Sequence, residues 1–270
     1  MTSPASHETA LEEEVQIHET AIIDESAELG QGVKIGPRAI IGPQVRIGSG
    51  TDVGPGVLVE RNTEVGSDCR IFQGAVLGTD PQDLKFEGEE TWLRIGDRTM
   101  IREYATLNRG TSWSRETVVG SDCLLMAYVH VAHDCHLGNH IIVSNATQMA
   151  GHVTIEDWAI VSGLVAVHQF VRIGAHAFVG GASRIAQDVI PYCRVVGNPP
   201  KLYGLNSVGL ERRGFGPEAR KALKRAYRQV FQSDLNISQG VARVREEQEV
   251  TPEVEHFLAF IESSERGVSV

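Results

Sequence analysis

The residues best able to do chemistry are crowded into one short stretch, VHVAHDCH, at positions 129–136. It holds three histidines, an aspartate and a cysteine, which are residue types that bind zinc and also types that build a supported catalytic base. They could equally be polar residues scattered along a strand. Further histidines follow at His152 and His168. The direction of each side chain decides between these interpretations, so the elements that carry them must be identified first.

A six-residue period organises most of the chain. Every sixth residue from Ile17 to Ile185 is Ile, Leu, Val or Met, except at Asp83, Glu89 and Trp113. The first residue of each block is usually small or β-branched, and the fourth is often Gly. First and third positions of a strand share one face and point inward, while Gly at the fourth turns the corner. A helix needs a period of 3.6, so the pattern predicts a parallel β-helix whose triangular coils contain eighteen residues.

The repeat also predicts the domain organisation. Residues 1–14 are expected to be a loose acidic tail, residues 15–200 the β-helix, and residues 201–270 a small helical domain that caps its open end. Pro217 and Pro252 are placed to start helices. Two consecutive blocks near residues 81–92 lack the aliphatic third residue, which predicts a loop that leaves the β-helix. Loops of this length are commonly functional.

Composition excludes several classes of function. The formal charge is −10, which argues against general nucleic-acid binding. The first residues contain no apolar run with a basic start, and no window resembles a membrane span. We therefore expect a cytoplasmic protein with no stable membrane insertion.

The eighteen-residue coil predicts where the histidines lie. His133, His152 and His168 fall on successive coils within one position of a single corner, and Gly151 falls one coil beyond His133. Cys135 is expected to face the interior, while His130 and His136 point outward on adjacent faces, so these three should not share a metal within one subunit. A metal shared between subunits and solvent-exposed corner histidines remain as alternatives.

Several motifs in order make the chain similar to a known family. These are DPQDLK, IGDRTMIREYATLNRGT, HVAHDCHLGN, AGHVTIEDWAI, AVHQFVRIGAHAFVGG and GLERRGF. The sequence resembles the UDP-N-acetylglucosamine O-acyltransferases, hexapeptide-repeat transferases that begin lipid A synthesis in Gram-negative bacteria. The resemblance implies a left-handed β-helix and a homotrimer with active sites between neighbouring prisms. It also implies that His133 is the general base, that Asp134 orients it and that the Gly151 N–H donates to the oxyanion.

The resemblance assigns further roles by motif. It implies transfer of a 3-hydroxyacyl chain from acyl carrier protein to the glucosamine 3-position of UDP-N-acetylglucosamine, with no metal and no cofactor beyond the carrier's phosphopantetheine. Gly181 matches the position that limits the length of the acyl chain. The implied substrate-binding residues are Asp83, Lys85, His130, His152, His168, Gln169, Asn206 and Arg212. Val208 stands where the family often has an acidic residue.

Two further points remain open at this stage. Five cations in nine residues form either a solvated helix face or a docking surface for the acidic carrier protein, namely Arg220, Lys221, Lys224, Arg225 and Arg228. The rival functions are a related N-acyltransferase, for which an extra N-terminal uridine-binding domain would be expected, a metal enzyme of the carbonic anhydrase kind, and a non-enzymatic scaffold. The acyl length, and whether the acceptor carries a 3-hydroxyl or a 3-amino group, are not fixed by the sequence.

Overall fold

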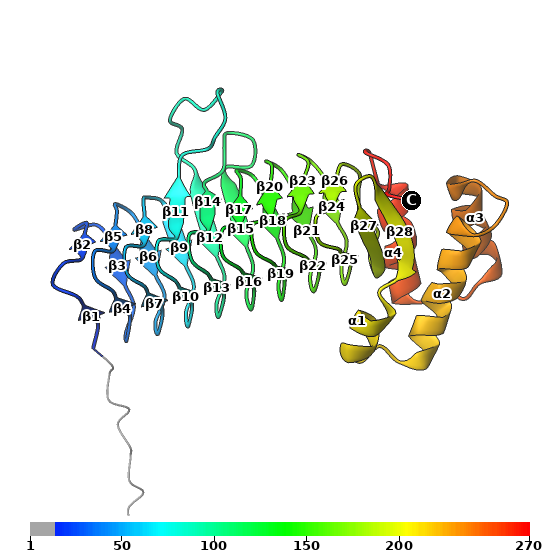
Figure 1. The fold of residues 1–270 in the computed structure, drawn as a ribbon, viewed down its shortest axis with the longest axis horizontal. Coiled ribbons are helices and arrows are strands. Elements are labelled where there is room, and N and C mark those ends of the chain that lie inside the picture. The colour runs from blue at the N-terminus through cyan, green and yellow to red at the C-terminus, as the bar shows by residue number, and fades with distance from the viewer. Residues whose placement is uncertain (1–13) are drawn as a thin grey trace, which may run out of the picture.

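The computed structural model describes residues 14–270, and the predicted tail up to residue 13 lies outside the described part. The chain winds into a long three-sided prism with helices at one end (Figure 1). The first face, sheet A, contains β1 (Gln16–Ile17), β4 (Lys34–Ile35), β7 (Asp52–Val53), β10 (Arg70–Ile71), β13 (Met100–Ile101), β16 (Leu124–Leu125), β19 (Ile142–Val143), β22 (Ile160–Val161), β25 (Phe178–Val179), β27 (Cys193–Gly197) and β28 (Pro200–Leu205).

The other two faces are built in the same way. Sheet B contains β2 (Ile22–Ile23), β5 (Ile40–Ile41), β8 (Leu58–Val59), β11 (Val76–Thr79), β14 (Thr106–Asn108), β17 (His130–Val131), β20 (Gln148–Met149), β23 (Ala166–Val167) and β26 (Arg184–Ile185). Sheet C contains β3 (Glu28–Leu29), β6 (Arg46–Ile47), β9 (Thr63–Val65), β12 (Trp92–Ile95), β15 (Glu116–Val119), β18 (His136–Leu137), β21 (Thr154–Ile155) and β24 (Arg172–Ile173). The strands pair in parallel with the next coil, and only the β27–β28 pair is antiparallel among those described.

The predicted hexapeptide β-helix is confirmed in its physical detail. Ile17 pairs with Ile35, and Ile35 with Val53, so equivalent residues repeat every eighteen positions. The side chains of Ile35, Val53 and their equivalents in later coils fill the prism and are almost completely buried, whereas Ile17 of the first coil is exposed. Corner residues such as His152 have a left-handed backbone, with φ of 63°, which turns the chain from one face to the next.

Two loops interrupt the regular coils. Ile71 pairs with Ile101, and Ile101 pairs with Leu125, so these two coils are longer than eighteen residues. The extra residues form loop one (residues 80–91), between β11 and β12, and loop two (residues 109–115), between β14 and β15. Both leave the prism on the same side, at the corner between sheets B and C (Figure 1). Loop one was predicted, whereas loop two was not. Loop two adds about one block of six residues, so the six-residue period continues after it in the same phase, and Trp113 is the one residue there that breaks the pattern.

Four helices form the C-terminal unit: α1 (Ser207–Arg212), α2 (Pro217–Phe231), α3 (Ile237–Glu247) and α4 (Pro252–Glu262). Their caps follow from local sequence, since Pro217 and Pro252 occupy first-turn positions and Asn236 forms a capping box with Gln239. Phe257 and other apolar helix residues pack against Cys193 of the last coil. The β structure continues through β28 to Leu205, past the boundary predicted at residue 200, because this strand folds back on β27.

The outer faces of the prism differ in chemistry. Sheet C carries alternating charges, which we call the charge ladder: Glu28, Arg46, Glu64 and Arg94 are in register on successive strands, and Glu116 lies diagonal to Arg94. Arg46 lies 3.4 Å from Glu28 and 3.1 Å from Glu64, and Arg94 bridges Glu64 and Glu116. Opposite charges on neighbouring strands stabilise a sheet, so each coil is held by its neighbours.

Sheet A instead carries an apolar stripe on its outer face. The first residue of each two-residue strand points outward, and five successive coils place Met100, Leu124, Ile142, Ile160 and Phe178 there, all half-buried. Such a contiguous apolar strip on a sheet face is typical of a surface that packs against another protein. In the described residues, no helix has the length and apolar character needed to cross a membrane.

Candidate active site

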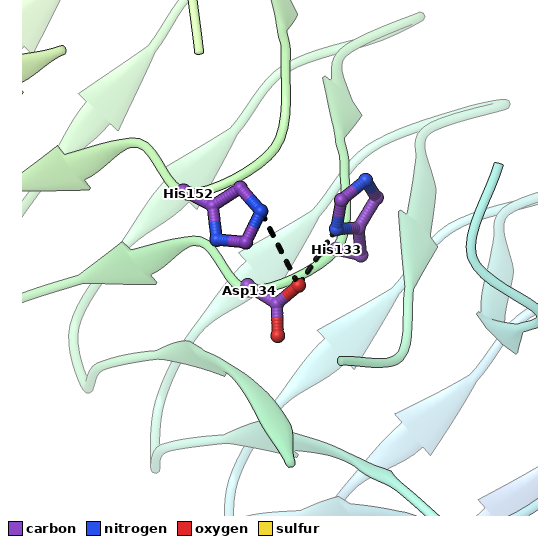
Figure 2. A group of neighbouring side chains, drawn as sticks. All are labelled: His133, Asp134 and His152. Atoms are coloured by element: carbon purple, nitrogen blue, oxygen red, sulfur yellow. Dashed lines mark hydrogen bonds and ion pairs between the residues drawn. The ribbon is translucent and has the colours of Figure 1, made fainter. Parts of the chain in front are cut away.

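The centre of the candidate site is a histidine–aspartate pair at the corner that follows β17. His133 Nδ1 lies 2.7 Å from an Asp134 carboxylate oxygen, and the Asp134 side chain is completely buried (Figure 2). Asp134 has a left-handed backbone, with φ of 59°, which turns its carboxylate back toward the ring of the preceding residue. Because Asp134 occupies Nδ1, the Nε2 atom of His133 is left to act on a ligand.

Loop two holds the aspartate in place. Thr111 donates to Asp134 from its backbone N–H at 2.9 Å and from its hydroxyl at 2.7 Å, and the Ser114 hydroxyl donates at 2.5 Å. Burial alone would raise the pKa of Asp134, but the hydrogen bonds from His133, Ser114 and Thr111 outweigh it and hold this pKa well below its ordinary value. Asp134 is therefore a fixed anion that orients His133. Sequence reasoning missed Thr111 and Ser114, whose residue types give no distinctive signal.

Gly151 lies directly against the imidazole, one coil further on. The backbone N–H of His152 donates to the His133 carbonyl at 3.0 Å, which fixes the register of the two corners. A Cβ atom at Gly151 would lie 2.6 Å from Cε1 and 2.8 Å from Nε2 of His133, so no side chain fits there without moving the ring. Among the described residues, no backbone or side-chain group accepts a hydrogen bond from the Gly151 N–H, which leaves this donor beside the base.

His152 completes the cluster from the same corner. Its Nε2 lies 3.8 Å from the Asp134 carboxylate, and its ring stacks on Phe170 with centroids 4.3 Å apart. Burial lowers the pKa of His152 and outweighs the opposing effect of the Asp134 carboxylate, so the ring stays neutral near pH 7. Trp113 of loop two meets the His152 ring edge-on at 5.4 Å, which makes one wall of the site aromatic. In the sequence, this aromatic wall was indicated only by Trp113, which stands where the six-residue pattern requires an aliphatic residue.

A cavity of about 510 Å³ opens above these residues. Its lining joins both loops to the corner: Gln82, Asp83, Lys85, Phe86, Glu89, Thr111, Ser112, Trp113, His133, His152, Gln169 and Phe170. A larger, shallower groove of about 700 Å³ follows the charge ladder on sheet C. We assign the site to the smaller cavity because only there do a histidine–aspartate pair and perturbed titratable groups converge.

The structure brings together part of the predicted residue set. His133, His152, Asp83, Lys85 and Gln169 all line the cavity. His168 was predicted in the same column but is exposed, with its Nδ1 lying 3.2 Å from Arg266 Nη2.

The remaining predicted residues lie elsewhere on the same chain. His130 lies on the outer face of sheet B, where it hydrogen-bonds the Thr106 hydroxyl at 2.7 Å. Gly181 lies at the corner between sheets A and B, after β25. Asn206 caps α1, and Arg212 is exposed in its last turn. The five predicted docking cations are on α2, four of them exposed, while Arg220 is half-buried and pairs with Glu211.

The arrangement fits an acid–base pair better than a metal centre. One atom each of His133, Asp134 and His152 lie within 4.8 Å of one another, which is close enough to hold an ion. However, the Asp134 oxygens already accept from His133, Thr111 and Ser114, so a metal would have to replace the His133–Asp134 hydrogen bond. Cys135 is buried in the core as predicted, and burial raises the pKa of its thiol to about 12. A base with a fixed anion behind it and a free N–H beside it suits attack on a carbonyl.

Comparison with known proteins gives consistent matches along the chain. The family model "Udp N-acetylglucosamine O-acyltransferase; Domain 2" matches residues 188–269, and "Bacterial transferase hexapeptide (six repeats)" matches residues 26–61. An acyl-[acyl-carrier-protein]–UDP-N-acetylglucosamine O-acyltransferase of Myxococcus xanthus is 51% identical over 94% of this chain and 99% of its own length. That of Synechocystis is 46% identical over 76% of this chain and 74% of its own length.

Solved structures are similar over the same range. The UDP-N-acetylglucosamine acyltransferase of Bacteroides fragilis superposes with a TM-score of 0.93 at 41% identity, covering 94% of this chain and all of its own. That of Francisella novicida gives a TM-score of 0.91 at 38% identity, covering 94% of each chain.

Proposed function

Because this chain belongs to the acyl-[acyl-carrier-protein]–UDP-N-acetylglucosamine O-acyltransferase family and is an acyltransferase, we propose that it performs the family reaction with His133 as its general base. The reaction transfers a 3-hydroxyacyl chain from acyl carrier protein to the 3-position of the glucosamine of UDP-N-acetylglucosamine, the first step of lipid A biosynthesis. The observation that carries the mechanism is the His133–Asp134 pair lying against Gly151.

The chemical step follows from this geometry. His133 Nε2 removes the proton of the sugar 3-hydroxyl while the oxygen attacks the thioester carbonyl, and Asp134 stabilises the imidazolium that forms. The Gly151 N–H donates to the oxyanion of the tetrahedral intermediate. The C–S bond then breaks, and the imidazolium returns its proton to the phosphopantetheine sulfur. The step needs no covalent enzyme intermediate, metal or further cofactor.

The substrate contacts are proposed on the same basis. Asp83 and Lys85 of loop one line the cavity and suit the sugar and its phosphates, because they offer a hydrogen-bond acceptor and a cation. His152 stays neutral beside the base and, with Gln169, contacts the substrates there. The exposed cations Lys221, Lys224, Arg225 and Arg228 of α2 would receive the acidic carrier protein.

We further propose that the working unit is a homotrimer. His130, His168, Gly181, Asn206 and Arg212 do not line the cavity of their own chain, so a neighbouring copy would supply the acyl-chain and nucleotide contacts. The apolar stripe on sheet A supports this assembly, because it leaves five half-buried hydrophobic residues facing outward. Sedimentation of the purified protein at micromolar concentration should give a mass three times that of the chain, and a monomer that turns over at the full rate would contradict the shared site.

The central experiment is an acyl-transfer assay with UDP-N-acetylglucosamine and a panel of 3-hydroxyacyl carrier proteins, with the 3-amino sugar nucleotide as a second acceptor. His133→Ala should lower kcat by about 10²- to 10⁴-fold, the usual contribution of a positioned base. His136→Ala is the matched control, because His136 lies in the same motif but is exposed on sheet C. Absence of transfer by the parent protein, or parental turnover by His133→Ala, would refute the proposal.

A further inference from the structure

The Glu89 carboxylate of loop one reaches across to the middle of loop two. One oxygen of Glu89 in loop one accepts from the backbone N–H of Ser112 in loop two at 2.9 Å, and the other accepts from the backbone N–H of Glu87 at 2.9 Å. Backbone hydrogen bonds, including those from Glu87 and Ser112, lower the pKa of Glu89, so it remains an anion at neutral pH. Glu89 thus ties loop two to the loop that carries Asp83 and Lys85.

The start of loop one is held separately, by Asn108 of β14 and by Arg109, the first residue of loop two. Arg109, which is 3% exposed, donates to the Gly78 carbonyl at 3.0 Å and pairs with the Asp80 carboxylate. Asn108 donates to the Asp80 carbonyl at 3.0 Å. Beyond the start of the loop, Lys85 and Phe86 hydrogen-bond only locally among the described residues, to Asp83, and a Cβ at Gly88 would meet nothing within 4 Å. Glu89 is therefore the hydrogen-bonded contact between this part of loop one and Ser112 of loop two.

On its other side, loop two contacts the catalytic pair. Ser112 lies between Thr111 and Ser114, whose side chains and backbone donate to Asp134, and Asp134 in turn holds His133 at 2.7 Å. A path therefore leads from Glu89 by a hydrogen bond to Ser112, along the backbone to Thr111, and by hydrogen bonds through Asp134 to His133. Trp113 sits in the middle of this path, 75% exposed and edge-on to His152.

We propose that Glu89 is a positioning residue that couples acceptor binding on loop one to the alignment of the His133–Asp134 pair through loop two. The proposal rests on the proposed function, since it takes UDP-N-acetylglucosamine as the ligand of Asp83 and Lys85. Binding of the sugar nucleotide sets the position of loop one, and Glu89 transmits that position to Ser112, so the base is best aligned when the acceptor is present. Glu89 itself touches neither reacting atom.

Glu89→Gln tests the coupling with little change of shape. A carboxamide has one acceptor oxygen and one NH₂ donor, so it cannot accept from both backbone N–H groups and sets a donor against one of them. Glu90→Gln is the matched control, because Glu90 is the adjacent glutamate, is exposed, and makes no hydrogen bond or ion pair among the described residues. Both variants lose one negative charge from the same loop.

Two measurements distinguish coupling from a merely structural role. The KM for UDP-N-acetylglucosamine should rise on the order of tenfold in Glu89→Gln, which is within the usual range for the loss of coupling between two sites. The fluorescence of Trp113, identified by subtraction of a Trp113→Phe variant, should change when the parent enzyme binds UDP-N-acetylglucosamine. That change should be smaller in Glu89→Gln even at saturation, and parental in Glu90→Gln.

Three results would overturn the inference: Glu89→Gln matching Glu90→Gln in both measurements, a raised KM with a full Trp113 response at saturation, or an effect confined to thermal stability. Failure of the proposed function would appear instead in the parent enzyme, as absence of acyl transfer to UDP-N-acetylglucosamine.

Discussion

Replacing Gly151 by alanine perturbs the site through a single methyl group. The new Cβ would lie 2.6 Å from Cε1, 2.8 Å from Nε2 and 3.1 Å from Nδ1 of His133. Since non-bonded carbon and nitrogen atoms are at rest about 3.5 Å apart, the imidazole must move by about 1 Å. Its 2.7 Å hydrogen bond to Asp134 cannot survive such a shift unchanged. Gly151 does not have the positive φ that would strain an alanine, so the fold itself should be preserved.

A misplacement of about 1 Å in a catalytic group costs roughly a hundredfold in rate, or about 2.7 kcal/mol of transition-state stabilisation. We therefore expect kcat for acyl transfer to fall about a hundredfold, with a thermal midpoint within a few degrees of the parent. Alanine keeps the backbone N–H, so the loss reports displacement of the ring and not loss of the oxyanion donor. Gly216→Ala is the control, because a Cβ there meets nothing within 4 Å.

A double-mutant cycle sharpens this test. If Gly151→Ala acts by displacing His133, the same change in a His133→Ala background should cost little, since there is no ring left to displace. Parental kcat in Gly151→Ala, or full additivity of the two changes, would refute the reasoning.

Three further predictions address specificity and stability. Gly181→Met should favour shorter acyl donors in a competition assay, and the protein should still fold because a Cβ at this position has ordinary space. Each methylene excluded from a buried acyl chain costs about 0.8 kcal/mol, roughly fourfold in kcat/KM, and an unchanged donor preference would count against this role. Lys224→Glu with Arg225→Glu should raise the KM for carrier-linked donor about tenfold but leave kcat unchanged, and an unaltered KM would reject α2 as the dock. Burial, aided by Arg213, lowers the pKa of His176 to about 4 from 6.5, so the unfolded chain binds the extra proton and stability should fall as pH drops from about 6.5 toward 4. His176→Phe should make the thermal midpoint less dependent on pH over that range, and an unchanged pH dependence would contradict the prediction.

The fold could be predicted because the amino-acid pattern repeats with the same six-residue period as the strands of the β-helix. The third residue of each block of six, as at Val131 and Met149, points into the prism, and the spacing of eighteen then places His133 beside Gly151. This prediction survived two interruptions because the extra residues of the two loops together amount to one whole coil, which restores the phase by position 133.

Other parts of the site could not be predicted for physical reasons. The same preserved phase hid loop two, and with it the threonine and serine that hold Asp134. Thr111, Ser114 and Glu89 act through backbone and hydroxyl hydrogen bonds that follow from loop geometry and leave no pattern in the sequence. His168 lies near the predicted column, but its side chain turns to Arg266, a contact between residues 98 positions apart. Gly181 and Arg212 lie away from the cavity of their own chain, and the proposal that a neighbouring copy supplies such contacts concerns an assembly of chains.

The charge ladder has a consequence for how the chain reaches its native winding. Aliphatic side chains of similar size repeat inside every coil. The interior therefore distinguishes poorly between a strand that pairs with the next coil and one that skips it and pairs with the coil after. On sheet C such an error would place Glu28 against Glu64, or Arg46 against Arg94, and like charges on adjacent strands repel. The sign of each surface charge thereby distinguishes neighbouring turns that the hydrophobic interior treats as equivalent. Concentrated salt, which screens this repulsion, would weaken that distinction first.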